Sequence, residues 1–139
     1  MINFNYETDF TLANEAHYEN WVSNIIASEN KTEGDISYIF VDDAYLLNLN
    51  IEHLQHDTLT DIISFDYSLG NQISGDIFIS VERVIDNAAD FETEFDIELK
   101  RVMAHGILHY CGYNDKNETE QAVMRSKEDD KIQMFHVEH

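Results

Sequence analysis

Four stretches of the chain have patterns that predict β-strands, and in the first of them apolar and polar side chains alternate. The first stretch covers residues 2–7, and the second is the apolar run at residues 36–42, after Gly34. Residues 61–68 and 73–81 form two more, and the short segment LGNQ that joins them favours a β-hairpin. We therefore expect a small sheet of about four strands.

Apolar residues at helical spacing predict helices between and after these strands. Residues 11–29 are amphipathic, and Asp42 and Asp43 can cap a short helix after the second strand. From Glu82 the pattern is helical and continues through a histidine-rich segment. We expect a break at residues 91–94, because an unbroken helix of that length would be unusual.

The chain ends in a polar helix, and Asn117 and Glu120 mark its start with the spacing of a capping box. The element order β-α-β-α-β-β-α-α-α predicts an α+β or α/β domain in which helices cover a small mixed sheet. The chain has no proline, and it contains no low-complexity segment and no internal repeat. We therefore predict one domain over residues 1–139.

The composition is that of an ordinary globular protein with one core. The chain has 139 residues, of which 43% are hydrophobic. No apolar run approaches the roughly 20 residues that span a bilayer, and the N-terminal segment is acidic where a signal peptide is basic. Cys111 is the only cysteine, so an intrachain disulfide is excluded and a reducing cytoplasm is the expected compartment.

The net charge argues against ordinary nucleic-acid binding. Eight Lys and Arg stand against 28 Asp and Glu, which gives a charge of −20 at neutral pH. A protein that holds nucleic acid through many phosphate contacts needs a basic patch, and the sequence shows none. Any role on nucleic acid must therefore depend on a bound metal, on a few local cations or on a partner that does the holding.

Residues 105–115, HGILHYCGYND, have the histidine spacing of metzincin-type zinc proteases. On a helix, His105 and His109 project side by side and can bind one cation. The helix is expected to end at Gly112, and a chain reversal there can return Asp115 as a third ligand. Three protein ligands leave one coordination position open, as in catalytic zinc sites. The pattern predicts one divalent ion per chain, with zinc as the expected ion.

Other interpretations of this segment stay open. Two histidines four residues apart are often surface or core side chains, and Asp115 could be an exposed turn residue. Cys111 can ligate zinc, but on a continuing helix it points away from the pair and is more simply a small buried apolar side chain. His136 and His139 have no further ligand in view.

The position of the protease general base is occupied by Gly106, which directly follows the first histidine. Peptide cleavage needs a base that also delivers a proton to the amine leaving group, so this glycine argues against a peptidase. Cleavage of RNA makes a different demand, because a metal can polarise a phosphoryl oxygen directly. The missing glutamate therefore argues against a protease more than against a nuclease, and it leaves the general base unassigned.

Three blocks together resemble the YbeY-type rRNA maturation factor family of bacteria. HGILHYCGYND resembles the family's H-G-x-L-H-L-x-G-Y-D-H, residues 60–65 (TDIISF) its T-D-V-L-S-F, and residues 75–80 (GDIFIS) its G-D-I-x-I-S. The resemblance implies a compact α+β domain with a metal in a cleft, held by His105, His109 and Asp115. It also implies a metal-dependent, single-strand-specific endoribonuclease acting in 16S rRNA 3′-end maturation and ribosome quality control. The implied partners are rRNA, the small ribosomal subunit and its proteins or assembly factors.

The chain departs from this family pattern at several positions. Asp115 stands where the family has its third histidine, and Leu54 stands where it has an arginine. If that arginine contacts phosphate in relatives, this chain lacks the contact, and His56 is a weak candidate to replace it. Asp61 is a second weak catalytic candidate, because it could line the cleft or orient a metal ligand.

Two polar residues of the TDIISF block have simpler interpretations. Ser64 is expected to cap backbone groups within a buried strand, and Thr60 to be a turn or strand-entry residue.

The competing function is a non-catalytic ribosome-assembly factor in which the metal only stabilises the last turns. A metallopeptidase comes last, because of Gly106.

Overall fold

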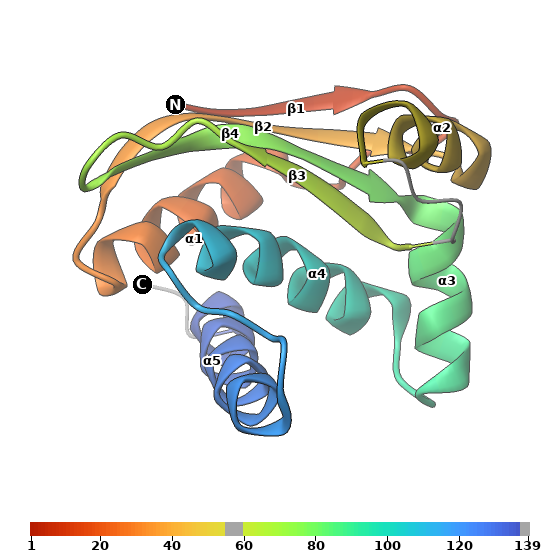
Figure 1. The fold of residues 1–139 in the computed structure, drawn as a ribbon. Helices are drawn as coiled ribbons and strands as arrows, with labels where there is room; N and C mark the ends of the chain where they lie inside the picture. The colour runs from red at the N-terminus through yellow and green to blue at the C-terminus, as the bar shows by residue number, and fades with distance from the viewer. Residues whose placement is uncertain (55–59, 137–139) are drawn as a thin grey trace.

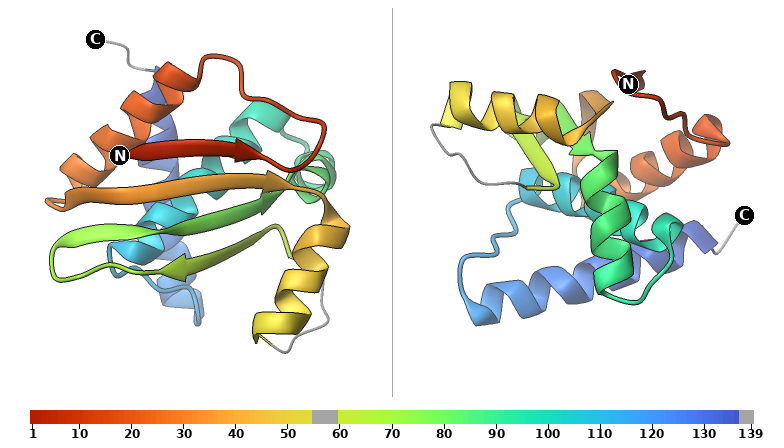
Figure 2. Two further views of the ribbon diagram at one scale, coloured as in Figure 1. Left: turned by 90° about the horizontal axis from the view of Figure 1, so that it is seen from above. Right: turned by 90° about the vertical axis from the view of Figure 1, so that its right-hand side faces the viewer.

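A four-stranded mixed sheet forms one layer of the protein and most of the helices form the other (Figure 1). This computed structural model describes residues 1–54 and 60–136, and the counts of elements refer to them. The strands are β1 (Ile2–Tyr6), β2 (Thr32–Val41), β3 (Ile62–Asp66) and β4 (Gln72–Ser80). They lie in the order β1-β2-β4-β3, visible from above in Figure 2. β3 is antiparallel to β4 and the other pairs are parallel, so the predicted mixed sheet and hairpin are confirmed.

The helices of the described residues follow the predicted order. They are α1 (Glu15–Ser28), α2 (Asp43–Leu49), α3 (Val81–Asp90), α4 (Phe95–Tyr110) and α5 (Glu118–His136), with a short π-helix, η1 (Asn50–Leu54), after α2. α1, α4 and α5 lie on one side of the sheet (Figure 1). α2 packs against the other side, where Leu46 joins Val41 and Ile63 in a small apolar cluster.

Several predicted boundaries are confirmed by hydrogen bonds. The Asp42 carboxylate accepts a bond from the backbone N–H of Tyr45 at the start of α2. The Asn117 side chain accepts one from the backbone N–H of Glu120, and the Glu120 carboxylate reaches back to the backbone N–H of Lys116. The predicted break at residues 91–94 separates α3 from α4. Local capping chemistry therefore sets these helix starts.

The starts of two elements differ from the prediction by four residues. α1 begins at Glu15 rather than at residue 11, because Asn14 takes a left-handed conformation with φ 62° that interrupts the helical pattern. β2 begins at Thr32 rather than at residue 36, because its polar first residues pair with Gln72 and Ile73 of β4. Backbone pairing extends a strand beyond its apolar run, and side-chain periodicity does not reveal it.

The core lies between the sheet and helices α1 and α4. Alternate residues of β2 and β4 face these helices, as period-two side-chain geometry requires. The fully buried members include Ile36, Tyr38, Phe40, Ile77, Ile79, Ile25, Met103 and Ile107. Among the described residues, no helix combines the length and the apolar character that crossing a bilayer requires.

At Gly106, α4 packs closely against the sheet. A Cβ atom placed on it would lie 3.0 Å from Ile77 Cδ1 and 3.2 Å from Ile62 Cδ1. A side chain at this position would therefore point into the core between α4 and the sheet. The glutamate of the protease motif could not stand here without displacing core side chains.

We expect a Gly106→Glu substitution to destabilise the fold by about 3 kcal/mol or more, because it would place a carboxylate in a packed apolar layer. Urea unfolding followed by circular dichroism measures this loss. Ser126→Glu, which adds the same charge at an exposed position of α5, serves as the control. Equal stability of the two variants would show that the contact at Gly106 is loose.

Candidate metal centre

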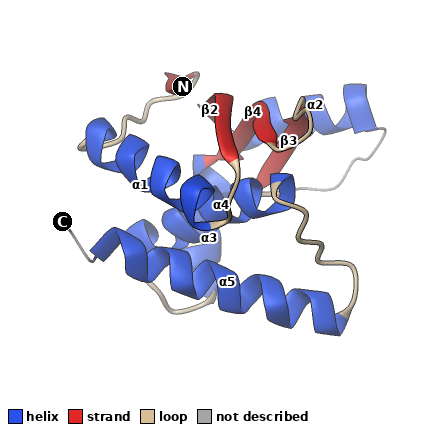
Figure 3. Ribbon diagram, turned by 90° about the vertical axis from the view of Figure 1, so that its left-hand side faces the viewer, coloured by secondary structure: helices blue, strands red, loops and turns tan. Residues whose placement is uncertain are grey.

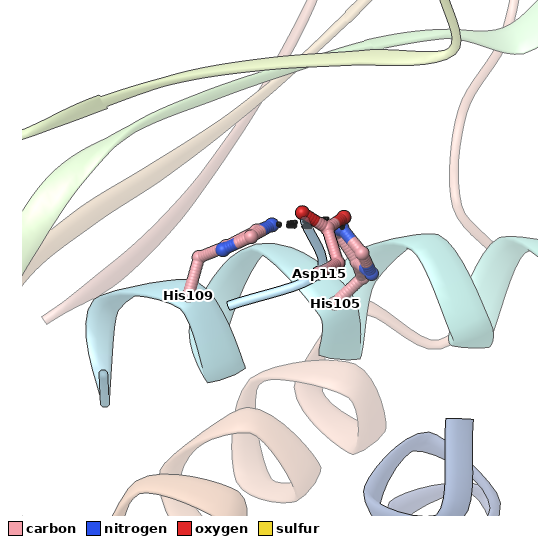
Figure 4. Close-up of side chains that lie close together, drawn as sticks. All are labelled: His105, His109 and Asp115. Atoms are coloured by element: carbon pink, nitrogen blue, oxygen red, sulfur yellow. Dashed lines mark hydrogen bonds and ion pairs between the residues drawn. The ribbon is translucent and has the colours of Figure 1, made fainter. Parts of the chain in front are cut away.

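The last turns of α4 bring two histidine rings together. His105 Nε2 and His109 Nε2 are 2.9 Å apart, and the planes of the rings cross at 82°. This closeness follows from the i, i+4 spacing on one face of a helix. The side-by-side projection predicted from the sequence is therefore present (Figure 4).

The chain reverses directly after these histidines, and Gly112 makes the reversal possible. Its φ of 105° is in the left-handed range that favours glycine. The backbone N–H groups of Gly112 and Tyr113 donate to the carbonyls of His109 and Leu108, which is the Schellman pattern of helix ends. Figure 3 shows the following loop running from α4 to the first turn of α5. The helix was predicted to end at Gly112, and α4 ends two residues earlier, at Tyr110.

Asp115 returns to the histidines on this loop. Its Oδ2 lies 3.3 Å from His105 Nε2 and 3.5 Å from His109 Nε2, as Figure 4 shows. The ligand atoms of the three residues lie within 4.8 Å of one another. Two ligands of a tetrahedral zinc ion, each about 2.0 to 2.1 Å from the metal, are about 3.3 Å apart. The spacing and the donor set of two imidazoles and one carboxylate therefore fit a divalent metal.

The second ring nitrogen of His105 is held by Glu128 of α5. His105 Nδ1 lies 2.6 Å from Glu128 Oε2, and Arg101 donates to the other carboxylate oxygen at 3.1 Å. An Nδ1–H that donates to Glu128 leaves the Nε2 lone pair directed at Asp115 and His109. Burial acts to lower the pKa of His105, but Glu128 and the more distant carboxylates raise it above its ordinary value.

Glu128 was not predicted from the sequence, although a signal for it exists. It lies four residues after Met124 and four before Ile132, and all three side chains are buried. A carboxylate on the buried stripe of an amphipathic helix requires a partner. The pattern could have indicated that such a partner exists, but not that it is His105.

A hollow of about 490 Å³ lies beside the three donors. Asp61 and Ser64 line it from the β3 side, and Arg125 lines it from α5. Asp61 was predicted to line the cleft or to orient a metal ligand, and it lines the hollow. Burial raises the pKa of its carboxyl group. Its Oδ2 accepts a bond from the Asn87 side chain at 3.3 Å.

The prediction for Ser64 was wrong. Ser64 is exposed on the wall of the hollow rather than buried, and β3, which carries it, is an edge strand of the sheet. Thr60 lies two residues before the start of β3 and its hydroxyl donates to the carbonyl of Ile62, so the strand-entry interpretation is confirmed. His56 lies outside the described residues.

Cys111 is not part of the donor group. The side chain is half-buried, and burial raises the pKa of its thiol to about 11. A protonated, partly buried thiol agrees with the interpretation of Cys111 as a small apolar residue. The side chains of His136 and His139 lie outside the described part of the chain.

Comparison with known proteins supports the interpretation of these motifs. The family model described as "Endoribonuclease YbeY" matches residues 3–136. The chain belongs to the YbeY endoribonuclease family. This assignment confirms the resemblance inferred from the three sequence blocks.

Members of the YbeY family match the chain over nearly its whole length. Two proteins named Endoribonuclease YbeY, from Flavobacterium johnsoniae and Flavobacterium psychrophilum, are 67% and 63% identical to it. Each alignment covers 99% of this chain, and 99% and 98% of those proteins, respectively. The solution structure of TM1509 from Thermotoga maritima is similar in fold, with a TM-score of 0.68 and 26% sequence identity over 97% of this chain and 89% of that one.

We expect Glu128→Ala to weaken metal binding by about 10- to 100-fold, because His105 then loses the partner that orients its ring. Competition with a chromophoric chelator measures the affinity. Asp129→Ala is the matched control, since Asp129 also binds Arg101 but does not contact His105. An affinity that falls equally in both variants would assign the effect to Arg101 or to net charge.

Tyr113 anchors the loop that carries Asp115. Its hydroxyl donates to Glu29 Oε1 at 2.7 Å, and Lys131 donates to the other oxygen at 2.7 Å. We expect Tyr113→Phe to reduce stability by about 1 kcal/mol, and to weaken metal binding as well because the loop is less restrained. Thermal unfolding with and without added zinc separates the two effects. A loss of stability with unchanged metal affinity would contradict the anchoring role.

Proposed function

We propose that this protein is a metal-dependent endoribonuclease that cleaves single-stranded RNA. The observation that carries the proposal is the convergence of His105, His109 and Asp115 on one wall of the hollow. The names of the relatives support the reaction class, and the chain's donor set supports the metal dependence. Zinc is the ion we expect, although nickel, cobalt and iron also suit two imidazoles and a carboxylate.

The three donors differ in how much of each side chain remains accessible. The His105 ring is fixed by Glu128, whereas the His109 and Asp115 side chains are 32% and 40% exposed. A phosphodiester can therefore approach the donor group from the side of His109 and Asp115. A divalent ion held there would supply Lewis acidity to a phosphoryl oxygen and polarise it for attack.

The residue that moves the proton is not the glutamate of the protease motif, since position 106 faces the core. Asp61 is the carboxyl group we propose for testing in this role, because it lines the same hollow and burial raises the pKa of its carboxyl group. The same geometry disfavours a metallopeptidase, which would need a base beside the first histidine.

The biological setting is part of the proposal and rests on family membership. We infer that the substrate is the 3′ end of 16S rRNA, that the activity serves ribosome quality control, and that it takes place in the cytoplasm. The small ribosomal subunit and its proteins or assembly factors are the proposed partners. A net charge of −20 suits docking on a basic ribosomal protein, and this also favours the second candidate, a non-catalytic assembly factor.

We expect His109→Ala to lose metal and RNA cleavage together, with a fall in rate of about 100-fold or more. Elemental analysis gives the metal content, and a fluorescent unstructured RNA with a matched duplex gives the rates. His53→Ala removes an exposed histidine elsewhere and is the control.

The outcomes of this experiment separate the candidates. Undiminished cleavage in metal-free protein would overturn the proposed mechanism. Full metal content without cleavage of any RNA would favour the assembly factor. Preferential cleavage of the single strand over the duplex is the result that supports strand specificity.

A further inference from the structure

Half of the lysine and arginine side chains of this acidic protein are paired with carboxylates. Eight Lys and Arg occur in the sequence, all within the described ranges. Those in ion pairs are Arg83, Arg101, Lys127 and Lys131. Lys100 is buried against the rings of Phe135 and Tyr18. Lys31, Lys116 and Arg125 make no ion pair with a carboxylate of residues 1–54 or 60–136.

Arg125 is the one of these three that lines the hollow beside the metal donors. It also lines an adjoining hollow of about 410 Å³ that includes His105 and Asp115. Its side chain is exposed, so its guanidinium is open to a ligand. Lys31 and Lys116 line neither hollow.

The face of α5 that carries Arg125 is directed at the metal donors. Gln121, four residues earlier, donates from Nε2 to the backbone carbonyl of Asp115 at 3.1 Å. Glu128, three residues later, holds His105. Residues at these spacings share one face of a helix. Arg125 therefore lies between two residues that hold the donor group, but it makes no hydrogen bond to that group itself.

A polyanion that enters this hollow needs a cation. The carboxylates of Asp61, Glu98 and Glu128 line it together with Asp115, and they repel phosphate. Arg101 also lines it, but its charge is compensated by Glu128 and Asp129. Guanidinium groups bind phosphate through two parallel hydrogen bonds, and one that makes no ion pair, although it lies near Glu98, is suited to this task.

We propose that Arg125 binds a backbone phosphate of the RNA strand adjacent to the phosphate at the metal donors. It is a substrate-positioning residue: it holds the strand in register while the donor group acts on the neighbouring phosphodiester. This inference rests on the proposed function, because it takes RNA as the ligand. It predicts that one local cation, rather than a basic surface, brings RNA to a protein of charge −20.

The test uses the full-length protein and a short fluorescent oligouridylate. Binding is measured by fluorescence anisotropy after removal of metal by a chelator, so that no cleavage occurs. We expect Arg125→Ala to weaken binding by about tenfold and to reduce the slope of log K against log salt by about 0.7. Arg125→Lys should keep the salt slope and recover part of the affinity, because the charge remains but the two-bond geometry is lost.

Two further measurements make the result specific. Lys31→Ala removes one positive charge outside both hollows and should leave RNA binding unchanged. In metal-loaded protein, Arg125→Ala should raise KM by about tenfold with kcat nearly unchanged, and its metal content should equal that of the parent. An equal effect of Lys31→Ala and Arg125→Ala would reduce the role of Arg125 to net charge and overturn the proposal.

The outcomes distinguish this inference from the proposed function. If the parent cleaves RNA but Arg125→Ala changes neither affinity nor KM, the inference fails and the endoribonuclease stands. If the parent binds RNA through Arg125 but never cleaves it, the phosphate contact stands and the nuclease fails. A parent that neither binds nor cleaves the oligonucleotide overturns both.

Discussion

The close packing of α4 against the sheet is the constraint on which the site depends. Gly106 allows the helix to approach Ile77 and Ile62 closely, and the Tyr38 hydroxyl donates to the carbonyl of Met103 at 2.9 Å. Because Gly106 holds α4 close to the sheet, the neighbouring flank of the helix presents His105 and His109 beside β3, in the hollow that Ile62 and Ser64 also line. The glycine that stands in place of the protease base therefore also helps to position the two histidines of the candidate metal group.

A second set of contacts, made by buried charged side chains, joins α5 to α4 and to the end of α1. Glu128 binds Arg101 and His105, and Lys131 binds Glu29, which also accepts the Tyr113 hydroxyl. Buried charges are costly unless they are paired and hydrogen-bonded, and these are. The result is that a mostly polar helix docks in one orientation. That orientation supports one metal ligand directly and restrains the loop that carries another.

The electrostatics of the protein reconcile a high negative charge with a role on RNA. Two of the carboxylates in this region have identified roles. Glu128 orients the His105 ring, and Asp115 is itself the third member of the donor group. In the proposed mechanism, the approach of a phosphate depends on the metal and on Arg125 rather than on a broad basic surface. A basic surface is the usual sequence signature of a protein that holds nucleic acid, and this sequence shows none.

The sequence alone determined whatever depends on neighbours along the chain. Strand alternation, helix caps, the histidine pair and the turn at Gly112 are local, so the element order and the donors His105, His109 and Asp115 could be predicted. The start of β2, the exposure of Ser64 and the partnership of Glu128 with His105 depend on which elements dock together. Only the tertiary structure decided these, because the packing of α5 and the edge position of β3 follow from side-chain fit between distant segments, which periodicity does not encode.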